Sequence, residues 1–106
     1  PTANLMLRHS NLPGGGVYAA TVSRREGEKL HGVVNVGFRP TVGGKRFLVE
    51  VHLLDHDENI YGQRLTVEFR HKMRPEKHFE SFDHLKVQIG RDIEQARKLL
   101  GEMYPL

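Results

Sequence analysis

The run Phe47-Leu48-Val49-Glu50-Val51-His52-Leu53-Leu54-Asp55 is the most strand-like stretch of the sequence. Its odd-numbered apolar residues, from Phe47 to Leu53, are expected to share one face of a strand, because side chains alternate between faces. The opposite face then carries Glu50, a carboxylate in mid-strand between two valines. Two interpretations are open. Glu50 lies on a solvated strand face, or the strand holds it rigidly as a general base.

Further strand-like runs lie on both sides of this one. Polar turns with glycine separate alternating apolar residues, which is typical of antiparallel hairpins. The strand at 47–55 is expected to pair with a strand at 64–70 as a hairpin, and residues 39–44, rich in proline and glycine, are expected to form a loop. The remaining predicted strands are a short one at 4–7 and a hairpin of 16–24 with 29–38.

The C-terminal part of the sequence has helical periodicity. Pro75 is expected to end the last strand, and Ser81 has the character of a helix N-cap. Apolar residues then recur at helical spacing from Leu85 to Leu100, and Gly101 is the expected C-cap. Several antiparallel strands followed by one helix predict a mainly β fold, a small barrel or sandwich on which the helix packs.

Length and composition limit the classes of protein that need to be considered. The 106 residues correspond to one domain, and the absence of cysteine suits a reducing compartment such as the cytoplasm. No apolar run approaches a membrane span of ~20 residues. The formal charge of +3 is a weak signal, because the basic residues are scattered. The seven histidines lack the spacing of a zinc site. The start at Pro1, without methionine, resembles a cut end.

Two further groups of residues carry possible chemistry. In Pro-Thr-Ala-Asn at 1–4, Thr2 and Asn4 offer hard oxygen ligands that point the same way if the backbone is extended, as a Mg²⁺ ion would require. The alternative is an ordinary turn. Arg-Pro-Glu-Lys-His-Phe at 74–79 is a basic, partly apolar loop that suits a planar or anionic ligand; the alternative is a solvated connection with Phe79 in the core.

Taken together and in order, these motifs resemble the riboflavin kinase family, and the resemblance covers nearly the whole chain. The run Asn-Val-Gly-Phe-Arg-Pro-Thr is similar to the bacterial branch, in which this domain is the C-terminal half of a bifunctional riboflavin kinase/FAD synthetase. The motifs are Pro-Thr-Ala-Asn-Leu at 1–5, Gly-Val-Tyr at 16–18, Val-Asn-Val-Gly at 34–37, Arg-Pro-Thr at 39–41, Val-Glu-Val-His-Leu-Leu at 49–54, Tyr-Gly at 61–62, and Arg-Pro-Glu-Lys at 74–77 with Phe79.

The resemblance implies a fold and a reaction. The family fold is a small six-stranded antiparallel Greek-key barrel with a C-terminal α-helix. The family carries a strand and a glycine-rich basic segment before Pro-Thr-Ala-Asn, so residues 1–106 are expected to be an N-terminally truncated kinase domain without the first strand. The reaction transfers the γ-phosphate of ATP to the 5′-hydroxyl of riboflavin, giving FMN and ADP.

The resemblance also implies roles for particular residues. Glu50 corresponds to the family's catalytic base. Thr2 and Asn4 correspond to the family residues that contact Mg²⁺ and the nucleotide phosphates. The nucleotide is expected near Leu53, Asp55 and Tyr61, and the flavin lid near Arg74 and Lys77.

The expected partners are riboflavin or FMN, ATP or ADP, and an N-terminal FMN adenylyltransferase domain in the parent chain; neither a membrane nor a nucleic acid is expected. The alternative is a non-catalytic small basic barrel that binds flavin or single-stranded nucleic acid. Nucleic-acid binding of that kind requires exposed aromatic residues on one sheet face, whereas the sequence has only eight aromatic residues, mostly on apolar strand faces.

Overall fold

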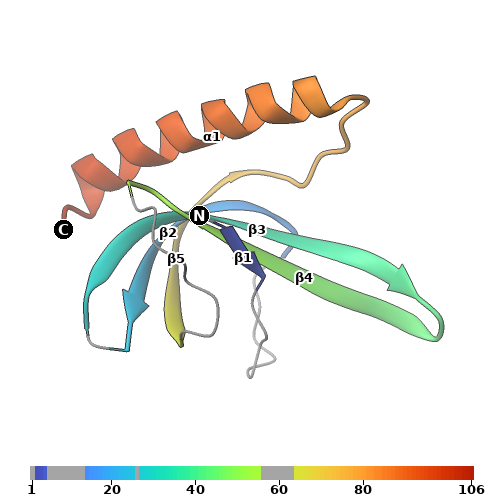
Figure 1. The fold of residues 1–106 in the computed structure, drawn as a ribbon, viewed down its shortest axis with the longest axis horizontal. Coiled ribbons are helices and arrows are strands. Elements are labelled where there is room, and N and C mark those ends of the chain that lie inside the picture. The colour runs from blue at the N-terminus through green and yellow to red at the C-terminus, as the bar shows by residue number, and fades with distance from the viewer. Residues whose placement is uncertain (1, 5–13, 26, 56–63) are drawn as a thin grey trace.

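The computed structural model describes residues 2–4, 14–25, 27–55 and 64–106. Within these ranges, five strands form one antiparallel sheet, and a single long helix lies across one of its faces (Figure 1). The elements are β1 (Thr2–Asn4), β2 (Gly16–Arg24), β3 (Lys29–Thr41), β4 (Gly44–Leu53), β5 (Leu65–Arg74) and α1 (Phe82–Met103).

The strands lie in the order β1-β4-β3-β2-β5. Consecutive hairpins join β2 to β3 and β3 to β4, and β5 then returns to pair with β2. This is a Greek-key order, since the fourth strand of the set lies beside the first. The predicted hairpin between residues 47–55 and 64–70 is therefore wrong: β4 pairs with β1 and β3, whereas β5 pairs with β2. Side-chain alternation specifies the faces of a strand but not its neighbours.

The predicted loop at 39–44 is also wrong. β3 continues to Thr41, and Val42 and Gly43 alone connect it to Gly44 of β4. Gly43 has a φ of 88°, which a tight hairpin turn requires and which glycine adopts without steric cost. Pro40 fits in β3 because pairing with β2 ends at Val36, so in the part of the chain that the structure describes the hairpin tip is two-stranded. This long hairpin extends past the rest of the sheet (Figure 1).

One face of the sheet is a continuous apolar core, and its alternation confirms the prediction for Val49, Val51 and Leu53. The ring of Tyr18 packs edge-on against Phe69, with 5.1 Å between ring centroids, and its hydroxyl donates to the carbonyl of Gly14 at 2.6 Å. The buried residues of this cluster are Tyr18, Ala20, Val22, Val34, Val36, Val49, Val51 and Leu53.

The opposite face packs against the C-terminal half of α1. Ala96 and Leu100 contribute the helical side of a second buried cluster, whose sheet side is Val17, Ala19, Val33 and Leu54. The Ser81 N-cap is confirmed, since its hydroxyl accepts a hydrogen bond from the amide of His84. The predicted C-cap at Gly101 is wrong: α1 continues to Met103 and is capped at Tyr104, whose amide donates to Leu100 at 2.8 Å.

Contacts from the sheet fix this C-terminal end of the helix. The Arg70 guanidinium lies 4.5 Å from the centre of the Tyr104 ring, and His31 Nε2 lies 2.7 Å from the Tyr104 carbonyl oxygen.

β1 and β5 end the strand order, so the sheet is not closed over the described ranges, and the six-stranded barrel is not observed there. None of the described helical residues forms a segment both long and apolar enough to cross a membrane.

Candidate functional site

A single register row crosses all five strands at the predicted base. Asn4 of β1 pairs with Glu50 of β4, and Glu50 pairs on its other side with Asn35 of β3. Asn35 pairs in turn with Val17 of β2, and Val17 with Arg74 of β5. The fold therefore aligns three residues of the predicted site, Asn4, Glu50 and Arg74, although they lie far apart in sequence.

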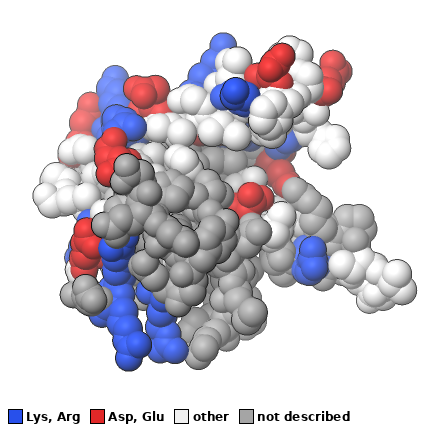
Figure 2. All heavy atoms as spheres, viewed as in Figure 1, with Lys and Arg blue, Asp and Glu red and all other residues white. Residues whose placement is uncertain are grey.

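A cavity of about 580 Å³ lies over this row. Its floor is the sheet, and its roof is the first half of α1 together with the segment 75–81. Figure 2 shows acidic and basic side chains interspersed along the helix on the face in view. The lining residues are Val17, Val33, Asn35, Glu50, His52, Arg74, Glu76, Lys77, His78, Phe79, Glu80, Ser81, Phe82, Leu85, Ile89, Asp92 and Ile93.

Glu50 is half-buried in the floor of this cavity. Its neighbours Val49 and Val51 are buried in the apolar core on the other face, so the strand backbone on which it sits is fixed. His52 lies two residues further on the same face, and burial lowers the pKa of its imidazole below 6.5. The same burial disfavours an imidazolium charge beside Glu50.

Asn35 is a residue of this site that the sequence analysis did not single out. Its backbone neighbours Val34 and Val36 are buried in the apolar core, which leaves the Asn35 amide on the cavity side. Its Oδ1 atom is buried and has no hydrogen-bond partner among the described residues. The available signal was an amide in the middle of an apolar strand, which usually has a specific partner when it is buried.

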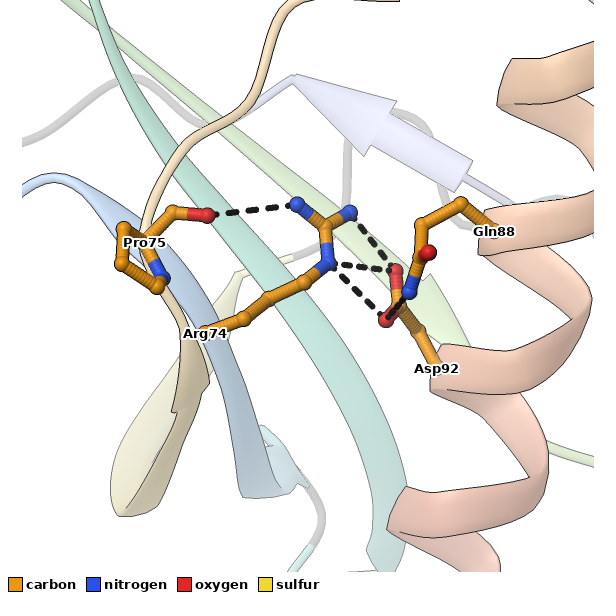
Figure 3. Close-up of polar contacts among 4 residues, drawn as sticks. All are labelled: Arg74, Pro75, Gln88 and Asp92. Atoms are coloured by element: carbon orange, nitrogen blue, oxygen red, sulfur yellow. Dashed lines mark hydrogen bonds and ion pairs between the residues drawn. The ribbon is translucent and has the colours of Figure 1, made fainter.

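Arg74 makes a bidentate ion pair with Asp92 (Figure 3). Its Nη2 donates to Asp92 Oδ2 at 2.8 Å and its Nε to Oδ1 at 3.0 Å. Nη1 donates to the Pro75 carbonyl, and Gln88 Nε2 donates to Asp92 Oδ1 at 3.0 Å. The pair ties the end of β5 to α1 and so holds the segment 75–81 over the cavity.

Asp92 was not predicted, although its place on the helix pointed to this role. Its side chain is only 3% exposed, and it follows Ile89 by three residues on the apolar stripe of α1. A carboxylate on such a stripe requires a charged or hydrogen-bonding partner. Gly16 makes room for that partner's strand: a Cβ there would lie 2.8 Å from the Arg74 carbonyl oxygen.

The segment between β5 and α1 gives the cavity an aromatic side chain and charged groups of both signs. Phe79 is half-buried, and the Arg74 guanidinium and the Lys77 ammonium lie 5.7 Å and 5.6 Å from the centre of its ring. Phe82, Leu85 and Ile89 of α1 also line this part. Apolar and aromatic side chains gathered at this part of the cavity, with polar groups around them, suit a flat aromatic ligand.

The residues predicted near the nucleotide do not line this cavity where the structure describes them. Leu53 is 1% exposed, and its side chain belongs to the core on the face opposite Glu50. Asp55 is exposed, has a φ of 55° and pairs with Arg97 of α1. The Asp55 carboxylate raises the pKa of Arg97 above its usual value. Tyr61 lies outside the described residues.

Thr2 and Asn4 belong to β1, whose register places Thr2 opposite His52 and Asn4 opposite Glu50. A threonine hydroxyl, an asparagine carbonyl and a carboxylate are hard oxygen donors, which fit a Mg²⁺ ion held by few protein ligands and completed by phosphates and water. In the described ranges no group of three or more His, Cys, Asp or Glu is placed to hold a metal on its own.

Comparisons with known proteins agree on one family. The family model described as riboflavin kinase matches residues 1–100. A bifunctional riboflavin kinase/FMN adenylyltransferase from Haemophilus influenzae is 53% identical over 97 residues, which cover 92% of this chain and 32% of that protein. The protein of the same name from Escherichia coli K12 is 47% identical, over 99% of this chain and 34% of its own length. The chain thus spans about a third of the length of these relatives.

A solved structure gives the same fold. It is described as a macrolide-efflux protein from Streptococcus pneumoniae, and it superposes with a TM-score of 0.85 at 33% identity. The match covers 92% of this chain and 32% of that one. The description concerns that protein, and the likeness supports the arrangement of sheet and helix found here.

Proposed function

The chain belongs to the riboflavin kinase family, and we propose that it transfers the γ-phosphate of ATP to the 5′-hydroxyl of riboflavin. The observation that carries this proposal is the register row of Asn4, Glu50 and Asn35 beneath a roofed cavity. Phosphoryl transfer depends mainly on positioning and charge stabilisation. A strand carboxylate beside hard oxygen donors and an apolar slot meets both requirements.

In the proposed reaction Glu50 is the base. It accepts the proton of the riboflavin 5′-hydroxyl while the new bond forms between that oxygen and the γ-phosphorus. The bond from the γ-phosphorus to the β–γ bridging oxygen breaks, and ADP leaves with that oxygen. The buried valines on both sides of Glu50 support this role, because they fix the strand on which a base must be held.

Thr2 and Asn4 would hold Mg²⁺ together with the nucleotide phosphates. When bound, the ion would neutralise charge on the phosphate oxygens. The position of β1 beside Glu50 supports this assignment. The nucleotide near Leu53, Asp55 and Tyr61 also remains a proposal, and a contact with Leu53 would involve its backbone because its side chain is in the core.

The flavin ring is proposed to occupy the slot beneath α1. Phe79, Phe82 and Leu85 offer apolar walls, and Lys77 offers a cation at the same side. Arg74 supports the slot through its ion pair with Asp92, so a contribution of Arg74 to flavin binding would be at least partly the positioning of the segment 75–81.

Three wider features belong to the proposal. A sixth strand would close the sheet into the Greek-key barrel of the family. An FMN adenylyltransferase module in the same polypeptide would use the FMN formed here, as the names of the relatives suggest. The absence of cysteine suits a cytoplasmic location.

The test is conversion of riboflavin to FMN with Mg-ATP, followed by chromatography with fluorescence detection. It uses the chain extended by the segment that the family carries before Pro-Thr-Ala-Asn. We expect FMN and ADP in equal amounts and no product without Mg²⁺. If neither FMN nor quenching of riboflavin fluorescence appears, the kinase proposal fails. Salt-dependent binding of a single-stranded oligonucleotide would favour the alternative function.

A further inference from the structure

We propose that Asn35 binds the hydroxylated chain of the acceptor substrate, through a hydrogen bond between its side-chain amide and a secondary hydroxyl of that chain. The inference rests on the proposed function and assigns a residue for the part of riboflavin between its reacting end and its ring. Asn35 would thereby select acceptors that carry a polyhydroxylated chain over flavins that carry only the ring.

The first step of the argument is the unsatisfied amide. Asn35 Oδ1 is buried without a hydrogen-bond partner, and such an atom loses its hydration without compensation. The flanking residues Val34 and Val36 are fully buried on the other face, so the strand backbone that carries the amide is fixed. An acceptor kept at this cost is explained if a ligand supplies the missing partner.

The second step is its position in the register row. Asn35 is one strand away from Glu50 and two strands away from Arg74, which corresponds to about 5 Å and about 10 Å at the usual strand spacing. Riboflavin has its reacting hydroxyl at one end of a five-carbon chain and its ring at the other. With that hydroxyl at Glu50 and the ring in the slot near Phe79, the chain passes over Asn35.

The third step is the chemistry of the amide. An amide has both an acceptor oxygen and N–H donors, and a half-turn about its terminal torsion exchanges them with little steric change. A hydroxyl group also both donates and accepts, so it can pair with either end. Phosphate oxygens only accept, so they could pair with the amide N–H groups but not with Oδ1. A Mg²⁺ ion would require further oxygen ligands, and the hard donors proposed for it lie on β1, on the far side of Glu50.

The experiment compares two ligands on the Asn35→Leu variant, since leucine has a similar shape without hydrogen-bonding groups. Dissociation constants are measured by flavin fluorescence for riboflavin and for lumiflavin, which has the same ring with a methyl group in place of the chain. Loss of one hydrogen bond is expected to weaken riboflavin binding by up to ~10-fold, with lumiflavin unchanged. The thermal midpoint without ligand should be equal or higher, because the unsatisfied oxygen is gone.

The Gln88→Leu variant is the matched control, because it also replaces an amide by leucine but removes a partner of Asp92. It should shift the two dissociation constants by the same factor. Asn35→Ser keeps a hydrogen-bonding group and should retain the preference for riboflavin, which covers the case in which the leucine variant does not fold.

The outcomes separate this inference from the proposed function. If the wild-type protein forms FMN and Asn35→Leu binds riboflavin as tightly as wild type, the assignment of Asn35 is wrong. The same conclusion follows if both flavins are weakened equally. If the wild-type protein neither binds riboflavin nor forms FMN, the proposed function itself fails, and the inference fails with it.

Discussion

The two faces of the sheet are built from the same strands but do different work. On one face, valines, leucine and tyrosine form a packed core, in which the valines and Leu53 are at most 1% exposed and Tyr18 is 7% exposed. On the other face, the C-terminal half of α1 packs on Ala19 and Val33, whereas its N-terminal half spans a cavity floored by Glu50 and Asn35. Side chains alternate between the two faces along each strand. The packed core on one face therefore fixes the strands whose other face forms the floor of the cavity.

This difference predicts which substitutions should affect activity and which should affect stability. Polar side chains that line the cavity, such as Glu50 and Asn35, contribute little packing, so altering them should change chemistry more than stability. Side chains on the filled face should show the reverse. The ion pair of Arg74 and Asp92 should affect both stability and binding, since Asp92 is buried and both residues line the cavity.

The largest expected effect is on catalysis, from Glu50→Gln. Loss of a general base is expected to lower kcat by ~10²–10⁴-fold, while the shape and the thermal midpoint stay near wild type. FMN formation and thermal unfolding measured on the same samples test this. A variant that keeps the full rate would remove Glu50 from the role of base.

The largest expected effect on stability comes from the filled face. Leu53→Ala removes a fully buried side chain and is expected to lower the free energy of unfolding by about 2–5 kcal/mol. Urea unfolding measures the change. Leu106→Ala is the control, because that side chain is 68% exposed and its loss should have little effect. Equal losses at the two positions would contradict the assignment of the core.

A smaller effect on stability is expected from breaking the ion pair of Arg74 and Asp92. Asp92→Ala leaves the Arg74 guanidinium without its carboxylate and is expected to cost about 1–3 kcal/mol of stability. Because the end of β5 then loses its ion pair with α1, the segment 75–81 is held less firmly over the cavity, and riboflavin affinity should fall as well. The double variant Arg74→Met with Asp92→Leu should recover stability but not affinity. Recovery of both would mean that the pair has no part in shaping the cavity.

The smallest expected effect is a gain in stability from Gly90→Ala. A Cβ at this helical position meets nothing within 4 Å, and alanine should stabilise the roof helix by about 0.5–1 kcal/mol. Thermal unfolding measures the gain. Gly27→Ala is the contrasting change, because Gly27 has a φ of 89° and alanine there should destabilise the β2–β3 turn. A loss at Gly90 would indicate that the helix needs local flexibility.

Local patterns predicted where strands and the helix occur better than they predicted which elements lie beside one another. The alternation from 47 to 53 predicted which residues face the core, and Ser81 predicted the start of α1, because both signals depend on nearby residues alone. Pro40 and Gly43 were interpreted as a loop, although a two-stranded hairpin tip accommodates both. The helix end at Tyr104 depends on contacts with Arg70 and His31, which no local pattern contains.

The sequence predicted the chemistry of the candidate site but not all of the residues that form it. A carboxylate in an apolar strand left two interpretations of Glu50 open, and the resemblance to the family favoured the base; the structure places Glu50 in the floor of a cavity. Asn35 and Asp92 interrupt apolar patterns in the same way, but their significance depends on pairings with β4 and β5. The partner of Arg74 could not be deduced from sequence, since nothing local brings residue 92 of the helix to the end of β5.

The Greek-key order has a consequence for how the molecule folds. The β2–β3 and β3–β4 hairpins close short loops, whereas β5 must return to β2 from across the intervening strands, and distant pairings close more slowly. The roof of the cavity follows β5 in the chain, so we expect the binding site to be assembled last. A ligand that binds there should slow unfolding and leave the folding rate nearly unchanged.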